Sequence, residues 1–273
     1  MKKNIKLIIF DVDGTLINDD RKLISENIEV IKKLRDKGIK IVLNSGRTFN
    51  AMWRVRQALG LMDFDDYSIC GTGAFIRRNA DGKALVSNPM GEKDYDRITS
   101  LLEGEDVQVA IHTKNYLYLN EEKPNRGFLV DQEQVGLAWM KFENFSDIED
   151  GISRVSISAE PEDLDRIYDK YGKDLENDYK LMRNEVYILE VLNKNAGKSE
   201  SLRKLLDILD MDSEEVMYFG DGMNDVKSLE LAGVGVAMGS GKKEAKDAAD
   251  FIIGNNNEPS IAEFLREYFS LDE

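Results

Sequence analysis

Residues 7–15 of the chain read Leu7-Ile8-Ile9-Phe10-Asp11-Val12-Asp13-Gly14-Thr15. The first four are apolar, and a short apolar run of this kind is typical of a strand buried on both faces of a parallel sheet. The run stops at Asp11, and Gly14 permits a tight turn directly afterwards. Because Asp11 and Asp13 lie two positions apart, both can face the same side as the chain leaves the strand. The segment therefore predicts a buried strand with two carboxylates at its carboxyl end.

Three other apolar runs also end in polar residues. They cover residues 39–43, 67–70 and 216–219, and they lead into Ser45-Gly46-Arg47, into Thr72-Gly73, and into the cluster Asp221, Asn224 and Asp225. Helical patterns from about Ser25 to Lys37 and from Phe49 to Leu59 separate the first strands. Alternating strands and helices predict an α/β fold, a doubly wound parallel sheet with helices on both faces.

The pattern changes in the middle of the chain. Residues 107–111 and 116–119 resemble a hairpin around Lys114-Asn115, and residues 180–183 and 186–192 resemble another. A helix is expected to start at Pro161 and to end near Tyr171. Hairpins with interspersed helices predict a separate α+β unit. We therefore expect a core formed by residues 1–84 and 189–273, with residues 85–188 inserted as a second domain.

Composition excludes several classes of function. The 273 residues carry a formal net charge of −15, which argues against binding to nucleic acid or to an anionic membrane. No apolar run approaches the roughly 18 residues of a membrane span, and Asp11 ends the N-terminal apolar run too early for a signal peptide. With a single cysteine, no internal disulfide can form. The sequence therefore predicts a cytoplasmic protein, either a monomer or a weak homo-oligomer.

The polar strand ends are expected to meet at one site, because ligands bind at the carboxyl ends of strands in open parallel sheets. Asp11, Asp13, Asp221 and Asp225 would crowd this site and raise each other's pKa. A divalent cation removes that conflict, and a set of oxygen ligands favours Mg²⁺. The chain has one histidine and one cysteine, so it lacks the side chains of a zinc cluster. Ser45 and nearby backbone N–H groups can hold phosphate oxygens.

These motifs resemble those of the haloacid dehalogenase (HAD) phosphatase superfamily and, more narrowly, its Cof-type (class IIB capped) sugar-phosphatase group. The resemblance rests on residues 11–16 and 220–225, each after an apolar strand, with Ser45 and Lys198 between them. It covers nearly the whole chain. It implies a Rossmann-like core and a cap domain, inserted between the second and third motifs, that selects the substrate.

The resemblance also implies roles for single residues. Asp11 would attack the phosphoryl group and form an aspartyl-phosphate, and Asp13 would act as general acid and then as general base. The phosphate would be bound by Ser45, Gly46, Lys198 and Asn224. Mg²⁺ would be bound by Asp11, Asp13, Asp221 and Asp225. The substrate would be a small phosphorylated metabolite, and a sugar phosphate in particular.

Candidate substrate contacts are Arg126 and Arg183 in the inserted domain and Asn193 just after it, chosen as polar side chains of the cap region. Two other functions are compatible with the motifs. A phosphomutase such as phosphomannomutase shares the Asp-Val-Asp-Gly-Thr segment, and a sensor could bind phosphorylated ligands without catalysis. The presence of Asp13 favours an enzyme, because a sensor does not need an acid/base at that position.

Overall fold

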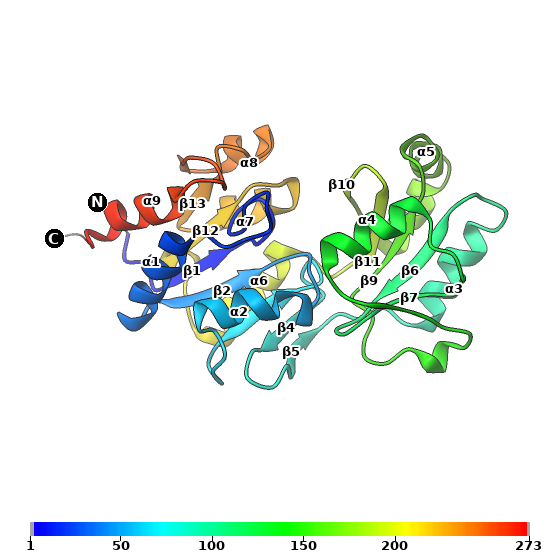
Figure 1. The fold of residues 1–273 in the computed structure, drawn as a ribbon, viewed down its shortest axis with the longest axis horizontal. Coiled ribbons are helices and arrows are strands. Elements are labelled where there is room, and N and C mark those ends of the chain that lie inside the picture. The colour runs from blue at the N-terminus through cyan, green and yellow to red at the C-terminus, as the bar shows by residue number, and fades with distance from the viewer. Residues whose placement is uncertain (1–2, 272–273) are drawn as a thin grey trace. The chain divides into compact units, whose positions relative to one another are not determined.

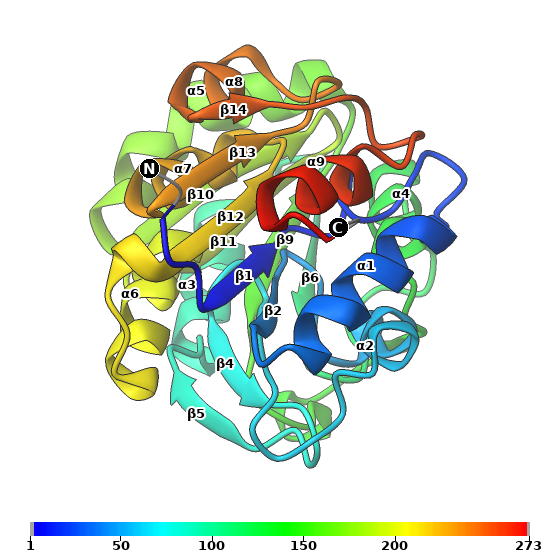
Figure 2. The ribbon, with the colours of Figure 1, turned by 90° about the vertical axis from the view of Figure 1, so that its left-hand side faces the viewer.

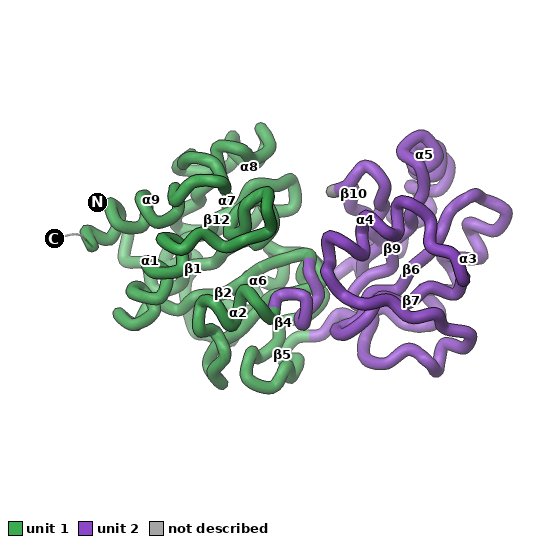
Figure 3. The backbone as a smooth tube through the Cα atoms, in the orientation of Figure 1, with its two compact units in different colours: residues 1–46, 53–86, 197–273 green, residues 47–52, 87–196 purple. Residues whose placement is uncertain are grey.

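The computed structural model describes residues 3–271 and divides into two compact units (Figure 3). Unit 1 comprises residues 1–46, 53–86 and 197–273, and unit 2 comprises residues 47–52 and 87–196. The sequence placed the second junction at residue 188. In the structure, strand β11 (Ile188–Asn193) pairs with two strands of unit 2, so that unit extends to Ala196.

An eight-stranded sheet forms the centre of unit 1 (Figure 1). Its order is β14 (Phe251–Ile252), β13 (Val234–Ala237), β12 (Val216–Gly220), β1 (Leu7–Phe10), β2 (Lys40–Asn44), β3 (Tyr67–Cys70), β4 (Phe75–Arg78) and β5 (Ala84–Ser87). From β14 to β3 all neighbours are parallel, and β4 pairs antiparallel with β3. The predicted parallel α/β sheet is confirmed. The antiparallel extension was not predicted.

Helices cover both faces of this sheet (Figure 2). One layer contains α1 (Ser25–Asp36), α2 (Trp53–Leu59) and α9 (Ser260–Phe269), and the other contains α6 (Lys198–Leu209), α7 (Val226–Leu231) and α8 (Lys243–Ala248). Side chains alternate along the strands between these layers. Leu7 and Ile9 pack with leucines of α6, whereas Phe10 stacks on Phe219, which in turn contacts Phe264 of α9. Short 3₁₀ helices are η1 (Asn50–Met52), η2 (Phe145–Asp147), η3 (Ser213–Glu215) and η4 (Met223–Asp225).

Unit 2 is an α+β domain with a six-stranded sheet. The order is β10 (Tyr179–Glu185), β11, β9 (Arg154–Ser158), β6 (Gln108–His112), β7 (Leu117–Leu119) and β8 (Trp139–Lys141). Both predicted hairpins are confirmed, as β6–β7 and β10–β11. Helices α3 (Glu92–Leu101) and α5 (Pro161–Asp178) share one apolar cluster with the sheet, and α4 (Arg126–Val135) packs in another.

The predicted end of α5 near Tyr171 was wrong, because the helix continues to Asp178. The added turns bury Leu175, which belongs to the same apolar cluster as Leu164 and Ile167. The spacing of these three residues keeps them on one face of a helix. Burial of that face extends the helix through a sequence rich in charged residues.

Unit 2 also contains a buried network of charged side chains. The Nε2 atom of His112 lies 2.9 Å from Asp131 Oδ2 and 3.0 Å from Ser156 Oγ. Arg154 binds Asp131 through Nη2 at 3.0 Å and Glu190 through Nη1 at 2.5 Å. All five residues are buried. Since an unpaired buried charge is strongly destabilising, the members of this network depend on one another.

We expect His112 to make folding stability fall as the pH is lowered. Burial lowers the pKa of His112 below its ordinary value of 6.5, against the opposing charge of Asp131. Below pH 6.5 the unfolded chain binds a proton that the folded protein does not, so acid favours unfolding, by at most about 1.4 kcal/mol per pH unit. Thermal unfolding of wild type and His112→Gln between pH 7.5 and 5 measures this effect. The variant should show the shallower pH dependence, and equal slopes would contradict the prediction.

Candidate active site

Four polar strand ends meet at one edge of the unit 1 sheet. They follow β12, β1, β2 and β3, which are consecutive and parallel. Backbone hydrogen bonds between neighbouring segments continue beyond the ends of the strands. Asp11 N donates to Phe219 O at 2.9 Å, and Ser45 N donates to Ile69 O at 3.0 Å. Thr72 N then donates to Ser45 O at 3.1 Å. The sheet itself therefore holds the loop starts together.

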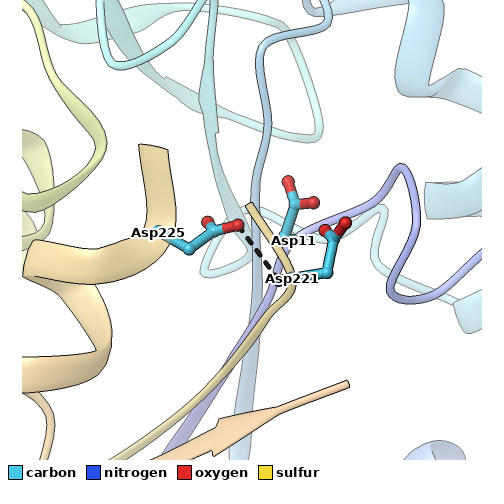
Figure 4. Close-up of side chains that lie close together, drawn as sticks. All are labelled: Asp11, Asp221 and Asp225. Carbon is cyan, nitrogen blue, oxygen red and sulfur yellow. Dashed lines mark hydrogen bonds between the residues drawn. The ribbon is translucent and has the colours of Figure 1, made fainter. Parts of the chain in front are cut away.

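Three aspartates gather at this edge (Figure 4). Asp11, Asp221 and Asp225 each offer one carboxylate oxygen, and these oxygens lie within 4.8 Å of one another. Asp11 and Asp225 are buried and Asp221 is half-buried. Carboxylate oxygens at this spacing suit a hard divalent cation such as Mg²⁺. The donor set therefore fits the ion that the sequence predicts.

Lys198 is buried between two of these carboxylates. It is the first residue of α6, and its Nζ atom lies 2.6 Å from Asp11 Oδ1 and 2.7 Å from Asp225 Oδ1. Burial alone would lower the pKa of Lys198, but the charges of Asp11 and Asp225 outweigh burial and raise it. The side chain is therefore an ammonium ion at neutral pH, aimed at the first aspartate of the chain's opening motif.

Asp225 has both carboxylate oxygens occupied by donors. Oδ1 accepts from Lys198 and from the Tyr218 hydroxyl at 2.7 Å, and Oδ2 accepts from the backbone N–H groups of Asp221 at 3.2 Å and Gly222 at 3.1 Å. An ionised carboxylate has about four lone-pair sites. A cation could therefore bind Asp225 directly only by displacing one of these donors. The hydrogen bonds of Asp225 instead hold the Lys198 ammonium ion and the loop at Asp221.

The site has more negative than positive charge. Burial raises the pKa of Asp11 well above its ordinary value, and the charges of Asp225 and Asp221 add to this effect while Lys198 opposes it. Burial and the charge of Asp225 also raise the pKa of Asp221. Three carboxylates face one ammonium ion here. A bound divalent cation would favour the ionised form of both groups.

Two glycines allow the loops of the site to approach closely. A Cβ atom at Gly14 would lie 2.4 Å from Asp221 Oδ2, and one at Gly73 would lie 2.1 Å from the carbonyl oxygen of Gly197. Both glycines have positive φ angles, of 76° and 84°. The second contact places the turn after β3 against the residue that precedes Lys198. Larger residues at either position would move a charged group of the site.

The other predicted core residues lie in the same loops. Asp13 is exposed and forms an isolated bridge with Ile17. Ser45 is buried, and Gly46 follows it at the boundary of unit 1. Asn224 is half-buried within η4, and its Oδ1 atom would lie 2.8 Å from a Cβ atom at Gly222. The structure thus brings all the predicted core residues to one end of the sheet, and their roles toward a substrate stay predictions.

Sequence reasoning missed three residues that support the site. Tyr218 donates to Asp225, Asn44 Nδ2 donates to the Lys198 carbonyl at 3.3 Å, and Thr15 Oγ1 donates to Asp221 Oδ1 at 3.2 Å. Asn44 precedes Ser45 and Thr15 ends the segment that contains Asp11 and Asp13, so both lie close in sequence to predicted site residues. Tyr218 lies inside an apolar run and carried none.

The three candidates in unit 2 have partners within that unit. The Arg126 guanidinium lies 4.8 Å from the centre of the Tyr187 ring. Arg183 forms an ion pair with Asp165 of α5. Asn193 Nδ2 donates to the backbone carbonyl of Pro89 at 3.1 Å. The role of each residue toward a substrate stays a prediction.

Comparison with known proteins places the chain among hydrolases. The family model described as haloacid dehalogenase-like hydrolase matches residues 8–265. YxeH of Bacillus subtilis is 30% identical, with 96% of this chain and 97% of that protein covered. The 5-amino-6-(5-phospho-D-ribitylamino)uracil phosphatase YitU of the same organism is 28% identical, covering 97% and 98%. A crystal structure of a haloacid dehalogenase-like hydrolase from Bacteroides thetaiotaomicron superposes with a TM-score of 0.89 at 25% identity, covering 96% and 99%.

These matches confirm the resemblance drawn from the motifs and the Rossmann-like core with its added domain. Among residues 3–271, no helix has the length and apolarity needed to cross a membrane.

Proposed function

The chain belongs to the haloacid dehalogenase-like hydrolase family, and we propose that it is a Mg²⁺-dependent phosphatase that acts through an aspartyl-phosphate on Asp11. One observation carries the proposal. A buried lysine, Lys198, bridges Asp11 and Asp225 at the carboxyl edge of the sheet, beside Asp221. This arrangement supplies a nucleophile, a fixed positive charge and oxygen ligands for a cation within one small volume.

In the first step a carboxylate oxygen of Asp11 attacks phosphorus, and the bond from phosphorus to the leaving oxygen breaks. Asp13, in its protonated form, gives its proton to the leaving oxygen, so the alcohol departs neutral. Lys198 offsets the negative charge of Asp11 and of the phosphate oxygens as they approach. Ser45, the Gly46 backbone and Asn224 bind the phosphate oxygens in this proposal.

In the second step water attacks the aspartyl-phosphate. Asp13, now ionised, accepts the proton of the water, the bond between phosphorus and the Asp11 oxygen breaks, and inorganic phosphate is released. Asp11 is thereby regenerated as a carboxylate. Two displacements at phosphorus, with Asp11 as nucleophile in the first and leaving group in the second, divide a difficult hydrolysis into two easier reactions.

The residues that would hold Mg²⁺ are Asp11, Asp221 and the backbone carbonyl of Asp13, with Asp225 orienting the loop. When bound, the ion supplies positive charge that offsets the repulsion between carboxylates and a phosphate dianion. The close packing of the three aspartates supports this assignment, because burial and, in addition, the charges of the neighbouring carboxylates raise the pKa of Asp11 and Asp221.

We propose small phosphorylated metabolites as substrates, with sugar and sugar-alcohol phosphates as the preferred class. YitU supports this choice, because the substrate in its name carries a phosphorylated ribityl chain. We also propose that unit 2, corresponding to the predicted insertion, selects the substrate. Arg126, Arg183 and Asn193 remain the candidate contacts.

Release of phosphate tests the proposal. The purified protein with Mg²⁺ should hydrolyse p-nitrophenyl phosphate. A panel of sugar phosphates, ribityl phosphates, flavin mononucleotide, pyridoxal phosphate and nucleotides, ranked by kcat/KM, should place the first two classes highest. Net transfer of phosphate that requires a sugar bisphosphate would instead identify a phosphomutase. Binding of phosphorylated ligands without turnover would identify a sensor.

A further inference from the structure

Tyr218 places a hydroxyl group under the active site from inside the core. It lies in the middle of β12, is fully buried, and packs in the apolar cluster that contains Leu7, Ile9 and leucines of α6. Its hydroxyl donates to Asp225 Oδ1 at 2.7 Å. Burying a hydroxyl is unfavourable unless it is hydrogen-bonded, and here the acceptor is a carboxylate of the site.

Asp225 Oδ1, which accepts the hydrogen bond from Tyr218, also accepts one from Lys198. Three contacts follow one another, from Tyr218 Oη to Asp225 Oδ1 at 2.7 Å, from that oxygen to Lys198 Nζ at 2.7 Å, and from Nζ to Asp11 Oδ1 at 2.6 Å. The ammonium ion is thus shared between two carboxylates. Its position depends on how strongly each oxygen attracts it.

We propose that Tyr218 is a positioning residue that holds Asp225 so that Lys198 stays in contact with Asp11; for catalysis, this role rests on the proposed phosphatase function. The phenol O–H donates to one lone pair of Asp225 Oδ1 and thereby weakens the attraction of that oxygen for a cation. Without that bond the oxygen attracts Lys198 more strongly, and the ammonium ion moves toward Asp225 and away from Asp11.

The other contacts of Asp225 remain when the phenol is removed. Its Oδ2 atom is still held by the N–H groups of Asp221 and Gly222, so the loop is retained. Phenylalanine fills the space of the Tyr218 ring without the hydroxyl. Tyr218→Phe therefore removes the contacts of the hydroxyl with Asp225 and Ser228, with little change in packing.

The first test is kinetic. With Mg²⁺ and p-nitrophenyl phosphate, Tyr218→Phe should lower kcat roughly tenfold and leave KM within about twofold, because the lost bond acts on the reacting aspartate rather than on substrate binding. Tyr95→Phe is the matched control. It removes a buried hydroxyl in unit 2 that has no hydrogen-bond partner among residues 3–271, and kcat should not change. A kcat for Tyr218→Phe within twofold of wild type would overturn the catalytic part of the proposal.

The second test does not depend on activity. Crystal structures of wild type and Tyr218→Phe, both without metal, should differ in the contact between Lys198 Nζ and Asp11 Oδ1, which is lost in the variant. An unchanged contact would overturn the positioning role. If wild type hydrolyses no phosphate ester, the proposed function fails, while this comparison still decides whether Tyr218 positions Lys198.

Discussion

The Asp11→Asn variant should fold normally and lose phosphatase activity by a factor of about 10⁴ or more, the range expected for removal of a nucleophile. The amide has the shape of the carboxylate but lacks its charge and nucleophilicity. The loss should appear in kcat with p-nitrophenyl phosphate and Mg²⁺. Asp207→Asn, an exposed position on α6, provides a control with the same chemical change and should keep full activity.

The same substitution should leave the protein as stable as wild type, or more stable. Burial raises the pKa of Asp11, as do the charges of Asp225 and Asp221, although Lys198 opposes the shift. When the pKa of an acid is higher in the folded than in the unfolded protein, folding stability falls as the pH rises above the ordinary pKa, here 3.8, toward the pKa in the folded state. At neutral pH the ionised form is therefore unfavourable, and a neutral amide removes that cost. Equal activity of variant and wild type would contradict the assignment of Asp11 as the nucleophile. A markedly lower Tm of the variant would contradict the expected stability.

Removal of Mg²⁺ should have the second largest effect. Treatment with EDTA should lower activity at least about 10³-fold, because a phosphate dianion would then approach three carboxylates balanced by one lysine. Added Mg²⁺ should restore activity. Activity that persists after thorough chelation would rule out the proposed role of the ion.

A binding measurement separates the ion's site from its chemistry. Mg²⁺ should raise the Tm of wild type, since a ligand that binds only the folded state stabilises it. Asp221→Asn should raise the Mg²⁺ concentration needed for half-maximal activity and for the Tm shift by about tenfold or more, because one oxygen ligand loses its charge. An unchanged Mg²⁺ requirement would exclude Asp221 as a ligand.

The sequence was most informative where structure follows from chain direction. Parallel strands bring their carboxyl ends to one edge, so Asp11, Ser45 and Asp221 could be placed together from apolar runs alone. Tyr218 could not be found in this way. In an apolar strand a tyrosine is typical of a packed ring, and its hydroxyl becomes informative only when Asp225 is seen within hydrogen-bond distance.

Unit 2 was less predictable for a related reason. Long charged side chains such as Arg126 and Arg183 find partners that depend on the complete fold. The same is true of the buried pair of His112 and Asp131, which come from strand β6 and helix α4, with strand β7 between them in the chain. The length of α5 also depended on tertiary burial of its apolar face rather than on local helix signals.

The pairing of β1 with β12 has a consequence for protein synthesis. Leu7 pairs with Val216, so β1 cannot pair with β12 until all of unit 2 has left the ribosome. At roughly 5–20 residues per second this wait is on the order of 10 to 40 s. All six strands of the unit 2 sheet are made within that interval. Asp11 is therefore translated before unit 2, yet the nascent chain acquires its complete carboxylate cluster only after unit 2 has been made.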